Sequence, residues 1–172
     1  MTRQTLLERS QPSPETPAAL SPEQWAILDA ITRRLLPQDD TSRVDLAGAI
    51  DRGLSMGTGD GWRHADLPPD LEAYARGLAC IDAIARERHE QAFVDLEPSE
   101  QDCVLRDVSE GRADRQDFAM SKWFGDLLAT ATEAYMAHPA TLARMGYDGM
   151  AFMPRWSPEE LGLRERREPS AP

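Results

Sequence analysis

The sequence has few residues of the kinds that build covalent or metal-dependent sites. It holds two cysteines, Cys80 and Cys103, in 172 residues. Two are too few for a disulfide scaffold, and they lack the C-x-x-C spacing of a redox or metal motif. They lie on successive predicted helices, offset by about 16 Å along the helix axes, whereas a disulfide needs Cα atoms within about 7 Å of each other. We therefore expect two free thiols.

Lysine and long apolar runs are also scarce. Lys122 is the single lysine, and 30 acidic residues outnumber 19 basic ones, which gives a formal net charge of -11. Such a charge disfavours nucleic acid and anionic membrane surfaces as partners. No apolar run has the length of a membrane span or a secretory signal, so we expect no direct membrane insertion. Because no export signal is visible, we expect a cytoplasmic chain. It would be periplasmic if it were exported with a partner or if its start lay upstream.

Recognisable cofactor motifs are missing as well. The chain has no C-x-x-C-H for covalent haem, no cysteine cluster and no G-x-G-x-x-G for a dinucleotide. An acid/base pair could be drawn from any of the 30 acidic residues, although solvated surface is the commoner use of such residues. A glycine-rich loop carries Asp60, His64 and Asp66, which could hold a metal, but its spacing matches neither an EF-hand nor a phosphate loop.

The apolar residues that are present recur mostly with helical spacing. Residues 1–20 are rich in proline and polar residues and are predicted to be a disordered lead. Ser21, Pro22 and Gln24 form a capping box with proline at the first helical position, which predicts a helix to Leu36, before Pro37. Further helices are predicted at 44–54, from Pro68-Pro69 through Leu96, at 100–109 after a Ser99 cap, and at 114–137, ending before Pro139.

No stretch alternates apolar and polar residues for long enough to indicate a strand. The sequence therefore predicts an all-α fold, a single-domain bundle of about five helices over residues 21–156, with a disordered N-terminus and an irregular aromatic C-terminal tail. Residues 157–172 are predicted to be a charged, flexible extension.

The last third of the chain carries large apolar side chains outside any helical period. They either fold back over the bundle or contact a partner, and aromatic, Met and Arg residues are the types enriched in interface cores. The helix around Trp123 would belong to the same surface, with Trp123 off the apolar stripe of that helix. The candidate interface residues are Trp123, Phe124, Tyr135, His138, Pro139, Tyr147, Phe152, Arg155 and Trp156.

Several short patterns follow one another along the chain: Leu35-Leu36-Pro37, a glycine-interrupted acidic helix, Phe93-x-x-Leu96, Gln101, Trp123-Phe124 and the stop Tyr135-Met136-Ala137-His138-Pro139. Their order resembles the gluconate 2-dehydrogenase subunit 3 family, and the resemblance extends from about Gln24 to Trp156. Many members have Tyr-Gly-Gly-Asn after that proline, where this chain reads Gly146-Tyr147-Asp148-Gly149, so the resemblance does not identify a sugar.

The resemblance implies an accessory role. Members of the family are small helical subunits without a cofactor of their own. They pair with a large FAD-containing subunit of the glucose-methanol-choline type, which oxidises a sugar or polyol, and a c-type cytochrome subunit often accepts the electrons. The chain would then be no enzyme by itself but a non-catalytic small subunit that binds and stabilises or matures the large one. The alternative is a free-standing helical protein-interaction domain with no flavoprotein partner.

Overall fold

The computed structural model describes residues 17–38, 44–57, 64–115 and 117–146. Within these ranges the fold is all-α and contains no strand, as the sequence predicts. The helices are α2 (Pro22–Leu35), α3 (Leu46–Met56), α4 (Asp70–His89), α5 (Pro98–Ser109), α6 (Met120–Ala137) and α7 (Pro139–Arg144), with a 3-10 turn, η1 (Phe93–Asp95). The short helix α7 was not predicted. No helix in these ranges is long and apolar enough to cross a membrane.

The first two helices begin where the local sequence predicts. Ser21 caps α2, and its hydroxyl accepts a hydrogen bond from the backbone N–H of Gln24 at 3.2 Å, while the Gln24 side chain accepts from the Ser21 N–H at 2.9 Å. Asp45 caps α3 by accepting from the Gly48 N–H at 2.8 Å. Each cap satisfies a backbone donor that the first helical turn leaves unpaired.

The longest helix ends earlier than predicted. The apolar pattern suggested one helix through Leu96, but α4 ends at His89 because Glu90 adopts a left-handed conformation with φ of 59°. Phe93 and Leu96 still reach the core, from η1 and the residue that follows it. The Asp82 side chain of α4 accepts a hydrogen bond from the Phe93 N–H at 2.9 Å. This contact holds η1 against the helix that precedes it.

Two helix starts also differ from the prediction. The N-cap of α5 is Glu97 rather than Ser99, with Pro98 at the first helical position. The last long helix, α6, begins at Met120 rather than near Asp114. Asp114 instead accepts from the N–H and hydroxyl of Ser121, at 2.8 and 3.0 Å, and so caps the helix from seven residues away.

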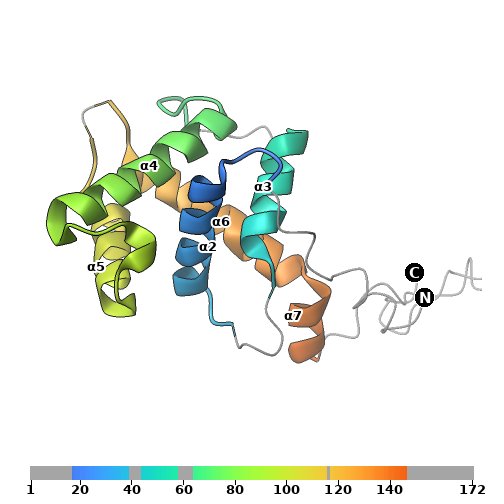
Figure 1. Cartoon of the computed structure of the whole chain (residues 1–172). Helices are drawn as coiled ribbons and strands as arrows, with labels where there is room; N and C mark the ends of the chain where they lie inside the picture. Colours follow the sequence, from blue (N-terminus) through green and yellow to red (C-terminus); the bar gives the residue numbers. More distant parts are fainter. Residues whose placement is uncertain (1–16, 39–43, 58–63, 116, 147–172) are drawn as a thin grey trace, which may run out of the picture.

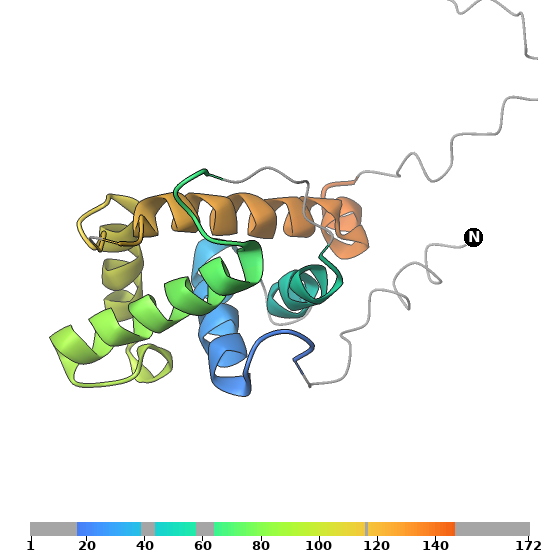
Figure 2. The same ribbon diagram turned by 90° about the horizontal axis from the view of Figure 1, so that it is seen from above.

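The helices enclose one core. Helix α2 contacts α3, α4 and α5, and α6 contacts α3, α4, α5 and α7. In Figure 1, α2 crosses in front of α6; in the perpendicular view of Figure 2, α6 and α7 lie along one edge of the molecule. The most completely buried large side chains come from almost every element: Trp123, Phe93, Leu28, Ile31, Leu46, Leu78, Ile81, Met120 and Leu127.

The segment before α2 is tied to this core. Leu20 is buried, and the Asp51 carboxylate on α3 accepts hydrogen bonds from the backbone N–H groups of Ala18, Ala19 and Leu20 at 2.5, 3.0 and 2.8 Å. The expectation that residues up to 20 form a disordered lead is therefore wrong for residues 17–20. Both cysteines are free thiols, as expected.

Candidate functional site

Two of the predicted interface residues lie in the interior. Trp123 is 1 % exposed and Phe124 is also buried, so neither ring is offered to a partner from this conformation. The indole of Trp123 meets Tyr74 edge to face, with centroids 6.1 Å apart, and lies 6.5 Å from the ring of Phe118. The expectation that Trp123 lies off the apolar stripe of its helix is corrected: Trp123 and Phe124 belong to the face of α6 that is packed inward.

A glycine on α4 makes room for this indole. A Cβ atom placed on Gly77 would lie 2.2 Å from Cε2 of Trp123, far inside van der Waals contact. The indole N–H is buried and has no hydrogen-bond partner in the described part of the chain, which costs about 1–3 kcal/mol. Trp123 therefore contributes through the area that its ring buries. A glycine in the middle of the longest helical pattern is a sequence signal for such a close approach.

Three further predicted residues meet at the junction of α6 and α7. The Tyr135 hydroxyl donates to the carbonyl of Pro37 at 2.8 Å and accepts from the Arg144 guanidinium, which also lies over the Tyr135 ring at 5.4 Å. His138 caps α7 by accepting at Nδ1 from the Ala140 N–H at 3.2 Å, and Pro139 is its first residue. These side chains join the ends of α2, α6 and α7 and are partly exposed.

The rest of the predicted interface cannot be placed. Tyr147, Phe152, Arg155 and Trp156 lie outside the described residues, which end at Gly146. Their role in binding a partner stays a prediction.

The outward face of α6 was not part of the predicted site, yet it is markedly apolar. Leu128 is 39 % and Met136 42 % exposed. Beside them on the helix surface lie Gly125 and Ala129, both exposed, and the half-buried Thr132. The spacing of four, three and four residues from Gly125 to Met136 places these positions on one stripe. The sequence did not indicate a role for this face.

The histidines do not converge on a common site. His64 Nε2 lies 3.7 Å from Asp126 Oδ1, beside the start of α6, and His89 Nδ1 lies 3.2 Å from Glu100 Oε1, at the far end of α4. Of the loop residues considered for a metal, Asp66 pairs with Lys122 and Asp60 lies outside the described ranges. No group of three potential ligands is found among the residues that the structure describes.

A serine-containing pattern, overlooked in the sequence, also proves structural. Residues Gly53 to Gly57 read G-x-S-x-G, the spacing of a hydrolase nucleophile elbow. That motif requires a strand-to-helix turn, whereas Ser55 lies in the last turn of α3. The pattern here is the end of a helix, with Gly57 in a left-handed conformation at its C-cap.

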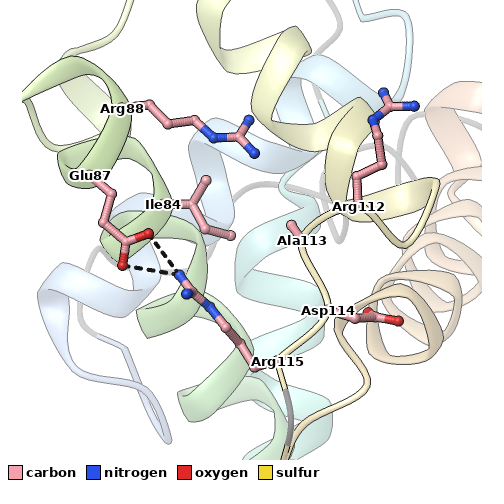
Figure 3. A pocket seen from close by; sticks show the side chains of 7 residues that line it. All are labelled: Ile84, Glu87, Arg88, Arg112, Ala113, Asp114 and Arg115. Carbon is pink, nitrogen blue, oxygen red and sulfur yellow. Dashed lines mark hydrogen bonds and ion pairs between the residues drawn. The ribbon is translucent and has the colours of Figure 1, made fainter.

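A shallow hollow of about 130 Å³ lies between α4 and the loop that follows α5. Figure 3 shows its arginines, and each is paired with a carboxylate: Arg115 with Glu87 at 3.0 Å, and Arg88 and Arg112 both with Asp107 at 2.5 Å. Hydrogen bonds from Arg112 and Arg88 lower the pKa of Asp107 below its usual value. The hollow therefore offers no unpaired guanidinium to an anionic ligand, and its charges join α4, α5 and the following loop.

The Cys80 thiol shows no sign of activation. Burial raises the pKa of Cys80, the opposite of what a nucleophilic thiolate needs. Burial likewise raises the pKa of the Tyr74 hydroxyl to about 12. Both groups are neutral at physiological pH and act as packing residues.

Comparison with known proteins identifies a family. A family model described as "Gluconate 2-dehydrogenase subunit 3" matches residues 22–154, most of the chain. No curated protein matches. No solved structure matches either. The matched range starts at the first residue of α2 and includes every helix of the described fold.

Proposed function

Because the chain belongs to the gluconate 2-dehydrogenase subunit 3 family, we propose that it is the non-catalytic small subunit of a flavin-dependent sugar or polyol dehydrogenase. In this role it binds the FAD-containing large subunit and stabilises or matures it. The observation that carries the proposal is the family match, which spans the whole helical bundle. A c-type cytochrome subunit is a further proposed partner, as acceptor of the electrons that the flavin releases.

The arrangement of charged groups supports assigning the flavin to the partner. FAD carries a pyrophosphate, which proteins bind with helix N-termini and unpaired cations. In the hollow of Figure 3, the arginines are already held by Asp107 and Glu87. A phosphate would have to displace those carboxylates to bind there.

The proposal is tested by co-expressing this chain, carrying an affinity tag, with the flavoprotein encoded beside it. We expect a flavin-containing subunit to co-purify in a fixed ratio, and its dehydrogenase activity or soluble yield to fall when this chain is omitted. The control is the same co-expression with a tagged, unrelated helical protein. The proposal is wrong if no flavoprotein co-purifies and the neighbouring flavoprotein is stable and active alone.

One observation fits the alternative of a free-standing helical interaction domain as well as it fits the small subunit. The chain closes its own core, with Trp123, Leu127 and Ala131 of α6 fully enclosed. A folded monomer in isolation is therefore expected under both proposals and does not separate them. Co-purification of the flavoprotein does, because the alternative predicts none.

A further inference from the structure

The outward face of α6 carries a glycine that the described part of the fold does not explain. A glycine inside a helix costs roughly 0.5–1 kcal/mol relative to alanine. Gly77 offsets this cost because Trp123 packs onto it, but a Cβ atom placed on Gly125 would meet nothing within 4 Å. Gly125 also has no positive φ angle that would demand glycine. A Cβ atom at Gly125 would be crowded only if the backbone of another helix lay close to it.

Neighbouring side chains extend this opening into an apolar stripe. Ala129, one turn along, is also small and exposed, and Leu128 and Met136 flank the two at 39 % and 42 % exposure. Small residues along the middle of a helix face allow a second helix axis to approach closely, while larger apolar residues beside them bury area against it. Met is also among the residue types enriched in interface cores.

None of the other helices that the structure describes covers this stripe. In Figure 2, helices α2, α3, α4 and α5 all lie on one side of α6. The loop before α4 reaches α6 along one flank, where Asp66 pairs with Lys122 and His64 lies beside Asp126. The positions of Gly125, Ala129 and Met136 stay exposed next to that flank.

The charge beside the stripe indicates the chemistry of its occupant. Glu133 is exposed, lies four residues after Ala129, and forms no ion pair or hydrogen bond within the described residues. The whole chain has a net charge of -11. A second copy of the chain would bring the same negative charge to the contact, whereas a helix with an arginine or lysine beside its small residues would complement it.

We propose that the outward stripe of α6, formed by Gly125, Leu128, Ala129 and Met136, docks a helix of the FAD-containing large subunit. That helix presents small residues where it crosses Gly125 and Ala129, and a basic side chain toward Glu133. This inference rests on the proposed function and specifies which surface performs it. It also gives the helix of Trp123 two roles, since its inner face closes the core and its outer face binds the partner.

The test uses two matched substitutions in the co-expressed, tagged full-length chain. Ala129→Leu adds bulk in the middle of the stripe, and Ala79→Leu makes the same change at an exposed position of α4. We expect Ala129→Leu to raise the Kd for the large subunit roughly tenfold or more, and Ala79→Leu to leave it within about twofold. Both variants should unfold within a few degrees of the wild-type chain, because both positions are exposed.

A second variant separates binding from folding. Gly125→Ala should raise the thermal midpoint of the isolated chain, because alanine favours the helix and meets no neighbour. The same variant should weaken the complex. A purely structural role for Gly125 predicts no loss of binding.

Each outcome bears on one proposal. If the wild-type chain captures no flavoprotein, the proposed function fails. If the wild-type chain does so and Ala129→Leu binds equally well, the docking site is wrong while the proposed function stands. If Ala129→Leu instead abolishes a dimer of this chain, measured by light scattering, and leaves flavoprotein binding unchanged, then a second copy occupies the stripe and the inference is overturned.

Discussion

Helices α4 and α6 are the two longest of the described chain, and they pack against each other through Trp123 and Gly77. Their outer faces differ. Helix α4 carries seven Asp, Glu or Arg residues, and Arg76, Arg86 and Arg88 all form ion pairs within the chain. Helix α6 carries three charged residues and leaves an apolar stripe exposed. The outer face of α4 is dominated by charged side chains, with Leu71 in its first turn as an exposed apolar exception, whereas α6 exposes two large apolar side chains beside small residues.

This difference separates stability from binding along one helix. Changes on the inner face of α6 should act on folding of the isolated chain, and changes on its outer face should act on the complex. The predictions below test that division, beginning with the inner face.

The largest effect is expected for Trp123→Ala. It removes the largest fully buried side chain and leaves a cavity against Tyr74, Phe118 and Gly77. The isolated chain should lose about 3–5 kcal/mol of unfolding free energy in urea titrations. Leu128→Ala, on the outer face of the same helix, is the control and should stay within about 0.5 kcal/mol. Equal losses for the two variants would remove the distinction between the faces.

The next effect concerns the tail beyond the described residues. Trp156→Ala should weaken the complex with the large subunit by about 2 kcal/mol or more, if Trp156 is an interface anchor. The unfolding midpoint of the isolated chain should barely move. A loss of a few kcal/mol in the isolated chain would instead mean that Trp156 packs on its own bundle. The tail would then not contribute to binding the large subunit beside α6.

A smaller effect is expected where α4 and α6 pack against each other. Gly77→Ala places a methyl group where the indole of Trp123 lies, so we expect a loss of about 1–3 kcal/mol, partly offset by the better helix propensity of alanine. The identical change at Gly125 should stabilise the isolated chain. Thermal unfolding of the two variants, measured side by side, checks the opposite signs. A loss at Gly125 would show that this glycine is needed by the fold itself.

The sequence predicted the fold where the signals were local. The capping box of Ser21 and Gln24 defines the start of α2, and Pro37 and Pro139 mark the ends of α2 and α6. The prediction failed where a residue caps a helix from a distance along the chain, or adopts a backbone conformation that its residue type disfavours. Glu90 ends α4 in a left-handed conformation that favours glycine, and Asp114 caps α6 from seven residues away.

The candidate site was predicted only in outline. The sequence placed Trp123 and Phe124 in the candidate interface, whereas the structure buries both on the inner face of α6. Met120, Trp123, Leu127 and Ala131 are spaced by three, four and four residues, so helical periodicity alone could have placed Trp123 inward. The exposure of Leu128 could not be read in this way, because it depends on which neighbouring helices cover α6.

The smallest effect concerns the paired charges at the outer end of α4. Arg112 and Arg88 lower the pKa of Asp107 in the folded chain. A carboxyl group with a lowered pKa stabilises the fold above its ordinary pKa, near 4, and this contribution is lost as pH falls through the lowered value. Between pH 5 and pH 2, roughly, the wild-type chain should therefore lose more thermal stability than Asp107→Asn.

Glu72→Gln, an exposed change in the first turn of α4, controls for the loss of one negative charge. Added salt should shrink the difference between wild type and Asp107→Asn, since the pairs are partly exposed and screened. Because these charges lie away from the stripe on α6, Asp107→Asn should bind the large subunit as the wild type does. Weakened binding by Asp107→Asn, with stability unchanged, would place the partner where α5 meets the end of α4 and would contradict the assignment of the outer face of α6.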